Sequence, residues 1–256
     1  MNRPATARRP ISAVIITLNA ARQLEACIES VRFADEIVIV DSGSTDGTLE
    51  IARRHGARTF HRAFDGFGPQ KQYAVSQALH DWTLCIDADE RISPQLRDAI
   101  EREFVDPEYM AYAFPRRNRF LGRWLRHGEG YPDLSLRLFD RRQARWSDDQ
   151  VHEKVQCNAP VGRLNGELLH DSAETLRAYL DKQNGYTSWQ AEALYRSGVR
   201  PSVAKLLLSP IARFVKFYIL RLGFLDGAPG LIHIAIGCFN TFSKNAKLLE
   251  VWLADR

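Results

Sequence analysis

The pattern of apolar and polar positions divides the first hundred or so residues into alternating strands and helices. Apolar runs rich in β-branched side chains, typical of strands buried on both faces, occur at 11–18, 36–40, 57–61, 82–86 and 109–114. Helical spacing of apolar residues, or a helix-start signal, lies between them at 22–32, 48–55, 69–79 and 93–104. This alternation predicts an α/β fold, a Rossmann-like and mostly parallel sheet with helices on both faces.

The second half of the chain has a different character. Residues 115–146 mix nine arginines with aromatic residues and glycines, which favours short ribbons and loops over long helices. Asp171 and Glu174 resemble a capping box and predict a helix to about residue 195. Two apolar and basic helical segments follow a linker at 200–201. We therefore expect a sheet domain over 1–198 and a helical, amphipathic appendage over 199–256.

The net charge of +4 is unevenly distributed. Residues 199–256 carry eight basic and three acidic side chains, a net charge of +5, so the preceding residues sum to −1. This distribution argues against a nucleic-acid binder and for a local contact with an acidic surface. One helical stripe beside a wide apolar face is formed by Lys205, Ser209, Arg213, Lys216 and Arg221. The pattern predicts a helix lying on an anionic membrane surface, or else a helix packed on the preceding domain.

Neither the apolar runs nor the cysteines indicate export. The longest stretch without a charged residue falls short of the ~20 apolar residues of a spanning helix. The apolar run at 11–18 fits a buried strand better than a signal peptide. The four cysteines lie too far apart for a zinc knuckle or a redox pair. A reducing, cytoplasmic setting is therefore expected.

Candidate chemistry lies where two predicted strands end. Asp41 begins a loop of small polar residues and glycine, and the second strand ends in Asp87-Ala-Asp89. Ligands of open parallel sheets bind beyond the carboxyl ends of the strands. Two carboxylates separated by one small residue can converge on Mg²⁺ or Mn²⁺ and leave positions open for phosphate oxygens. Each motif alone is commonly an ordinary turn, but the pair in a βα pattern predicts a nucleotide and metal site.

Three segments in order give the chain a resemblance to glycosyltransferase family 2. They are ISAVIITLN from residue 11, VDSGSTDGT from residue 40 and DADE from residue 87. The resemblance covers roughly residues 11–170 and implies a GT-A fold and an inverting, metal-dependent transfer from a nucleotide sugar. Later segments are similar to the lipopolysaccharide core β-1,4-glucosyltransferases, which add glucose to the inner-core heptose. These segments are YPDLSLRLF from 131, VHE from 151, LH from 169 and LGFLDG from 222.

The resemblance implies a role for each matching position. The residues expected to bind the nucleotide sugar, a UDP-sugar, are Thr17, Asn19, Asp41, Lys71 and Asp87. Asp89 would hold Mg²⁺ or Mn²⁺, and His170 matches a histidine that approaches the metal or the diphosphate. Glu153 would be the catalytic base where the family usually has an aspartate, and Asp133 is the alternative. Arg116, Arg117 and Arg137 are expected to bind an acceptor rich in phosphate and carboxylate. The alternative is that these arginines belong to an ordinary solvated surface.

The sequence thus predicts an enzyme that moves a hexose, glucose from UDP-glucose, to the inner-core heptose of lipopolysaccharide. Its expected location is peripheral, on the cytoplasmic face of the bacterial inner membrane, where the lipid-linked acceptor is found. One alternative is the same chemistry on a polyprenyl phosphate or another cell-envelope polysaccharide precursor. Another is a non-catalytic nucleotide-sugar-binding membrane adaptor, against which the presence of Asp41, Asp87 and Asp89 argues.

Overall fold

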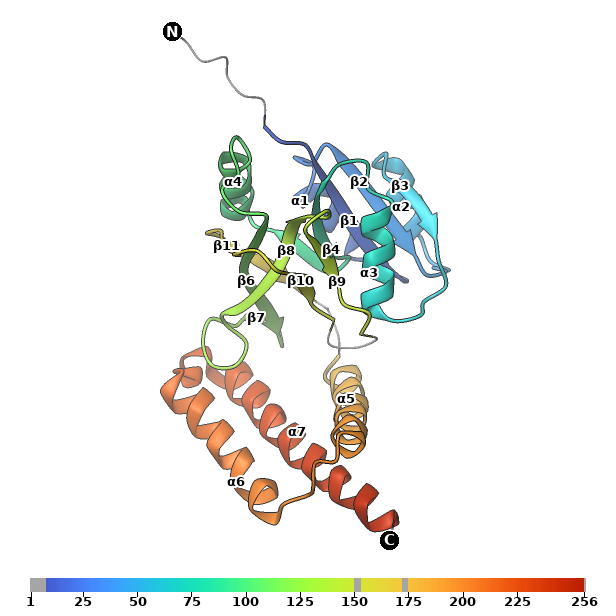
Figure 1. Cartoon of the computed structure of the whole chain (residues 1–256). Helices are drawn as coiled ribbons and strands as arrows, with labels where there is room; N and C mark the ends of the chain where they lie inside the picture. The colour runs from blue at the N-terminus through green and yellow to red at the C-terminus, as the bar shows by residue number, and fades with distance from the viewer. Residues whose placement is uncertain (1–7, 150–152, 172–174, 256) are drawn as a thin grey trace. The chain divides into compact units, whose positions relative to one another are not determined.

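The structure is a computed structural model that describes residues 8–149, 153–171 and 175–255, and the chain forms two compact units. The sheet unit comprises Met1–Arg116 with Asp133–His170, and the helical unit comprises Arg117–Pro132 with Asp171–Arg256 (Figure 1). The division expected from the sequence, at residue 198, differs from this one. The reason is that helix α5 (Leu176–Arg196) packs along the C-terminal helix α7 (Gly227–Ala254).

The sheet unit is built on one large sheet in the order β3-β2-β1-β4-β8-β6-β12-β5. Its parallel strands are β1 (Ile11–Thr17), β2 (Glu36–Asp41), β3 (Arg58–His61) and β4 (Trp82–Asp87). Beyond β4 the pairing becomes antiparallel through β8 (Asp133–Asp140) and β6 (Ala111–Phe120), and β12 (Leu168–His170) pairs antiparallel with β5 (Glu90–Ile92). The short β11 (Gly162–Arg163) runs parallel to β6, and β9 (Ala144–Trp146) and β10 (Val155–Cys157) form a separate ribbon.

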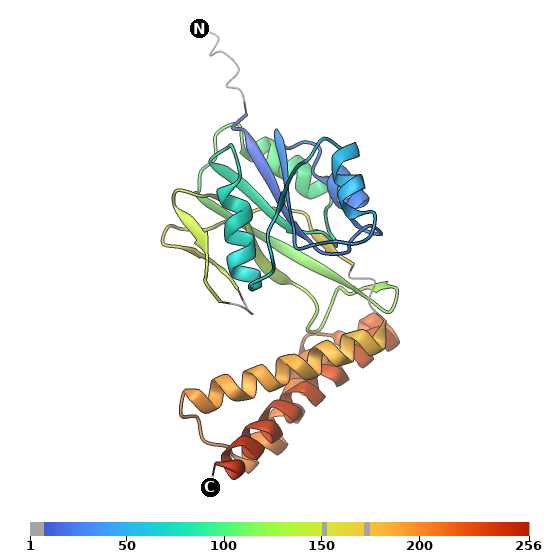
Figure 2. The same ribbon diagram turned by 90° about the vertical axis from the view of Figure 1, so that its right-hand side faces the viewer.

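Helices cover both faces of this sheet, as the apolar runs predict (Figure 2). Alternate residues of β1 enter different cores: Ala13 and Ile15 join the first, and Val14 joins the second. The first core contains side chains of α1 (Leu24–Ser30), α2 (Thr48–Arg54) and α4 (Pro94–Glu103). The second contains Ala74 and Val75 of α3 (Phe67–Ser76). The α/β fold class is therefore confirmed.

Several expected boundaries move for identifiable reasons. The strand expected to end at residue 114 continues to Phe120, because it pairs with β8 as far as Arg116 and then with β7 (Arg123–Trp124) at Arg119 and Phe120. Strand β8 is itself eight residues long, in a region expected to hold short ribbons and loops. Helix α4 begins as predicted, with the Ser93 hydroxyl accepting a hydrogen bond from the Leu96 N–H at 3.2 Å. Helix α5 begins later than expected, because the Thr175 hydroxyl caps the Ala178 N–H. Glu174 of the expected capping box lies outside the described residues.

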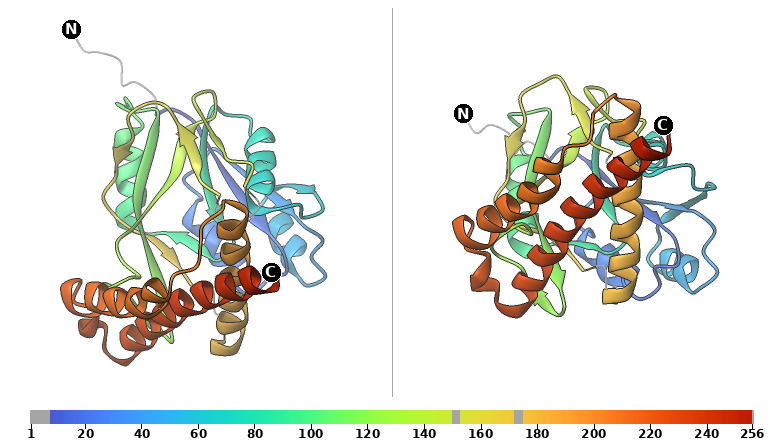
Figure 3. Two further views of the ribbon diagram at one scale, coloured as in Figure 1. Left: turned by 60° about the horizontal axis from the view of Figure 1, so that its bottom comes forward. Right: turned by 90° about the horizontal axis from the view of Figure 1, so that it is seen from below.

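The helical unit is organised around α7, which packs against both α5 and α6 (Val203–Phe214), as Figure 3 shows. Wider π-type turns continue α6 over Val215–Leu220, and a 3₁₀ turn follows at Gly223–Asp226. The short β7 (Arg123–Trp124) pairs with the end of β6. Asp226 is 2% exposed and accepts hydrogen bonds from the N–H groups of Arg126 and His127. The LGFLDG segment therefore anchors the loop after β7.

One member of the expected basic stripe faces the interior of the helical unit. Arg213 pairs with the Glu129 carboxylate and donates to the Thr241 hydroxyl at 3.0 Å. Its place on an exposed stripe is therefore a wrong prediction, because a helical wheel cannot see the acid supplied by the 125–130 loop. No single helix within the described ranges is long and apolar enough to cross a membrane. The pair Val203–Leu220 and Gly223–Ala254, bent by 73°, passes that test only together.

Candidate active site

The carboxyl ends of three parallel strands bring three of the predicted ligand-binding residues to one edge of the sheet. Thr17 at the end of β1 is in register with Asp41 at the end of β2, and Ile16 is in register with Asp87 at the end of β4. Parallel pairing alone produces this convergence, since all three strands run in the same direction. The buried hydroxyl oxygen of Thr17 has no hydrogen-bond partner among the described residues, which leaves it available to a ligand.

Asp41 and Asn19 shape the loops beside this edge. One carboxylate oxygen of Asp41 accepts hydrogen bonds from the Gly43 and Ser44 N–H groups, both at 2.8 Å. The side-chain oxygen of Asn19 accepts a hydrogen bond from the Thr45 N–H at 2.9 Å. The backbone N–H of Asn19 donates to the Ser44 hydroxyl at 2.8 Å. Asn19 has a φ of 50°, a left-handed conformation that asparagine tolerates better than most residues. Asn19 therefore joins the first loop to the second at the predicted pocket, and Asp41 fixes the shape of the second loop.

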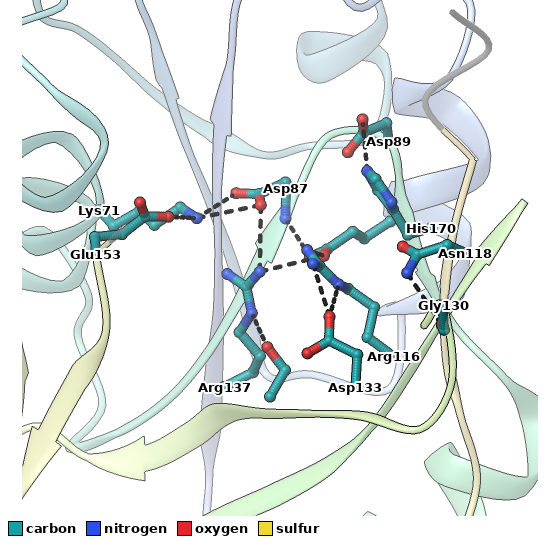
Figure 4. A network of polar contacts seen from close by, with 12 residues as sticks. Lys71, Asp87, Asp89, Arg116, Asn118, Gly130, Asp133, Arg137, Glu153 and His170 are labelled. Carbon is teal, nitrogen blue, oxygen red and sulfur yellow. Dashed lines mark hydrogen bonds and ion pairs between the residues drawn. The ribbon is translucent and has the colours of Figure 1, made fainter. Parts of the chain in front are cut away.

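Lys71 contacts both Asp87, which is predicted to bind the nucleotide sugar, and Glu153, which is the predicted catalytic base. Its ammonium, on a side chain only 5% exposed, lies 3.0 Å from an Asp87 carboxylate oxygen and 2.7 Å from Glu153 Oε1 (Figure 4). The same ammonium is 4.9 Å from the centre of the Trp146 ring, at cation–π distance. Helix α3 positions Lys71, the end of β4 positions Asp87, and the segment before β10 positions Glu153. Residues distant in the sequence thus form one charged cluster, although the neighbouring His152 lies outside the described residues.

The cluster continues through two arginines to two further acids. Arg137 Nη2 lies 3.4 Å from Asp87 and 3.2 Å from Glu90, and Arg116 lies 2.8 Å from Asp133 and 3.5 Å from Glu90. Burial raises the pKa of Asp87, but the ammonium of Lys71 and the guanidinium of Arg137 outweigh burial and hold that pKa well below its usual range. Burial lowers the pKa of Arg137, and Glu90 and Asp87 more than compensate, so it stays protonated.

Glu90 is the member of this cluster that the sequence analysis did not single out. It is fully buried, and it accepts a hydrogen bond from the Asp87 N–H at 2.9 Å as well as the two arginine contacts. Such partners offset the cost of burying a carboxylate. The signal for it was present in the sequence, because Glu90 is the third acid of the DADE segment and the first residue of β5.

The arginines expected to meet an acceptor have different surroundings. Arg137 is buried between Asp87 and Glu90, and Arg116 is half-buried beside Asp133. Arg117 belongs to the helical unit, with its guanidinium carbon 5.9 Å from the centre of the Trp124 ring. Arg137 and Arg116 therefore neutralise site carboxylates, and an acceptor contact by any of the three remains a prediction.

The predicted metal residue Asp89 and His170 face each other. Antiparallel pairing of β12 with β5 places His170 opposite Glu90, and its Nε2 lies 3.3 Å from Asp89 Oδ2. Burial lowers the pKa of His170, but the hydrogen bond that its imidazole donates to Asp89 and the charges of Asp89 and Glu90 raise that pKa overall. No cluster of three or more His, Cys, Asp or Glu in the described ranges could hold a metal ion by itself. A carboxylate and an imidazole suit Mn²⁺, with phosphate oxygens and water completing its shell.

Comparisons with known proteins identify the family of the chain. The family model of glycosyl transferase family 2 matches residues 12–163. The lipopolysaccharide core biosynthesis glycosyltransferase LpsC of Rhizobium meliloti is 32% identical over 94% of this chain and 92% of its own length. An uncharacterized glycosyltransferase of Rickettsia typhi is 32% identical over 97% of this chain and 89% of its own. A structure of glucosyl-3-phosphoglycerate synthase from Mycobacterium tuberculosis with Mn²⁺, UDP and glucosyl-3-phosphoglycerate is 25% identical, with a TM-score of 0.37 over 46% of this chain and 50% of that chain.

Proposed function

The chain belongs to glycosyl transferase family 2 and is a glycosyltransferase, and we propose that it transfers glucose from UDP-glucose to the inner-core heptose of lipopolysaccharide. The contact that carries the proposal is the 2.7 Å ion pair between Lys71 and Glu153, beside Asp87 at the strand ends. The name of the Rhizobium meliloti relative, a lipopolysaccharide core biosynthesis enzyme, supports the acceptor class.

In the proposed reaction, an acceptor hydroxyl oxygen attacks the anomeric carbon of the sugar, and the bond from that carbon to the diphosphate oxygen breaks. Glu153 takes the hydroxyl proton, UDP leaves with the bonding electron pair, and the configuration of the sugar inverts. Lys71 holds the Glu153 carboxylate in place through the 2.7 Å ion pair. A divalent cation held by Asp89 and His170 would neutralise the charge that develops on the departing diphosphate.

Asp133 is the alternative base, and its surroundings distinguish it from Glu153. Its carboxylate makes two contacts with Arg116, an Nε hydrogen bond at 2.9 Å and an Nη2 contact at 2.8 Å. Both contacts are made by one guanidinium to the same carboxylate oxygen, Oδ2, which is therefore already engaged. Glu153 has one described cationic partner, Lys71, which is shared with Asp87.

The test is transfer by the full chain, with UDP-glucose and a heptose-terminated lipopolysaccharide core, followed by mass analysis of the product. We expect Glu153→Gln to lower transfer by about 10²–10⁴-fold while UDP binding is retained. Glu101→Gln, at an exposed glutamate of α4, is the matched control and should leave transfer unchanged. Near-normal transfer by Glu153→Gln with loss in Asp133→Asn would move the base to Asp133.

Two further arms test the rest of the proposal. Removal of divalent cations by a chelator should stop transfer, and Mn²⁺ or Mg²⁺ should restore it, whereas Asp89→Ala should lose metal-dependent UDP binding. Transfer of a different sugar from another UDP-sugar, with none of glucose from UDP-glucose, would change the donor that we assign. Transfer to a polyprenyl phosphate, with none to the core oligosaccharide, would change the acceptor and leave the catalytic assignment intact. Binding of UDP-sugars without transfer or hydrolysis would favour the adaptor alternative.

A further inference from the structure

The helical unit has an apolar face that its own packing does not cover. Along α6 and the turns that continue it, exposed apolar side chains recur every three or four residues, at Val203, Leu207, Ile211, Val215, Ile219 and Leu222. Leu207 and Ile211 are 57% and 60% exposed. The neighbouring helix α7 adds exposed Leu231, Phe239 and Phe242. An exposed apolar surface of this extent is characteristic of an interaction site. We call these nine residues the α6–α7 face.

The exposed charges of α6 and its continuation have one sign. Between residues 199 and 249 the only acid in the sequence is Asp226, which is buried against the Arg126 and His127 N–H groups. The exposed charged side chains of α6 and its continuation are Lys205, Lys216 and Arg221. Arg213 does not interrupt the apolar stripe, because it turns inward to Glu129. The segment therefore offers a solvent-facing surface of apolar and cationic groups.

From this combination we propose that the α6–α7 face lies on an anionic lipid bilayer. Apolar side chains enter the boundary between head groups and acyl chains, while lysines and arginines at the edge meet lipid phosphates. A second copy of this chain would place the same cations opposite one another, and like charges would oppose that association.

The proposal does not depend on the reaction, and its test measures binding alone. The full chain is floated through a sucrose gradient with vesicles of phosphatidylcholine, or of phosphatidylcholine mixed with phosphatidylglycerol. We expect it to float with the mixed vesicles and to bind the neutral ones at least several-fold more weakly. Raising the salt concentration should weaken binding to the mixed vesicles, because screening acts on the cationic contribution.

Substitutions test whether the α6–α7 face makes the contact with lipid. Leu207→Glu with Ile211→Glu places two charges on exposed positions, so the fold should survive, and vesicle binding should fall tenfold or more. Trp189→Glu is the matched control, because Trp189 is 54% exposed on α5, outside the α6–α7 face, and its binding should equal that of the unmodified chain. Lys205→Gln with Arg221→Gln should reduce binding to anionic vesicles and flatten its salt dependence. Thermal unfolding of each variant confirms that it is folded.

Three outcomes would overturn the proposal. The first is a chain that floats with neither kind of vesicle. The second is a chain with Leu207→Glu and Ile211→Glu that floats as well as the unmodified chain. The third is a dimer in solution that Leu207→Glu with Ile211→Glu converts to a monomer without changing vesicle binding, which would assign the α6–α7 face to a second copy.

Discussion

At the scale of single residues, Lys71 is the position on which the charged cluster depends most. Its ammonium is shared by Asp87 and Glu153 and is almost entirely buried. Removing one partner of a buried ion pair leaves an uncompensated charge, which costs about 3 kcal/mol or more. We expect Lys71→Met to lower the free energy of unfolding by about that amount and to lower transfer severely. Lys71→Arg keeps the charge and should lose much less stability, as urea unfolding of both variants would show.

The pH dependence of this loss follows from the lowered pKa of Asp87. Because its pKa in the folded chain lies below that in the unfolded chain, its ionisation contributes stability above the unfolded pKa of about 4. That contribution is lost as the pH falls through the folded pKa. The difference in unfolding free energy between the unmodified chain and Lys71→Met should therefore be constant from pH 7 to pH 5 and shrink below about pH 4. A difference that already disappears between pH 7 and pH 5 would contradict this account.

The sequence could indicate which residues carry the chemistry, but not which contacts they make. Asp41, Asp87 and Asp89 were recognisable because strand ends and motif spacing are local properties. The contact of Lys71 with Glu153 joins positions far apart in the chain and requires the tertiary fold. The burial of Glu90 between two arginines was equally inaccessible, because burial depends on β6 and β8 packing beside β4. Roles in substrate binding remain predictions for all of these residues.

At the scale of elements, a close approach between α3 and the segment after β9 controls the position of the site. A Cβ at Gly68 would lie 2.2 Å from the Ser147 carbonyl oxygen and 2.6 Å from that of Asp149. Those contacts are with backbone atoms, so Gly68→Ala must separate the helix from the segment that leads to Glu153. Since α3 also positions Lys71, we expect a lower melting temperature and a disproportionate fall in kcat. Gly185→Ala, where a Cβ would meet nothing within 4 Å, should instead stabilise α5 by about 0.5–1 kcal/mol.

The elements were more predictable than their partners. Periodicity located β1, β2, β4, α1 and α4 because each buries a regular apolar pattern, and the Ser93 cap is a local signal. The extension of β6 to Phe120 was missed because it arises from pairing with β8 and then with β7, in a stretch whose many arginines suggested loops. The inward turn of Arg213 was missed for the same reason, since Glu129 comes from another part of the chain.

At the scale of the whole molecule, the C-terminal helix completes a unit that begins well before it in the sequence. Lys247 on α7 donates to Asn184 Oδ1 at 2.6 Å and to the hydroxyls of Thr187 and Ser188, all on α5. Asn240 donates to Gln183 at 2.8 Å. Most of the stability of a helix in a protein comes from tertiary packing of one face rather than from intrinsic propensity. The boundary expected at residue 198 would therefore separate α5 from the helix against which it packs.

Deletion of residues 199–256 is expected to unfold α5 as well as to remove the tail. The truncated chain should lose more helical circular dichroism than the deleted helices account for, and amide hydrogens of Leu176–Arg196 should exchange rapidly. The chain with Leu207→Glu and Ile211→Glu is the matched control, because it keeps α7 and should retain slow exchange in α5. A truncated chain with a protected α5 would show that this helix is held by contacts other than those with α7. For the same reason, loss of membrane binding on truncation alone would not identify the lipid-facing surface, whereas the paired substitutions would.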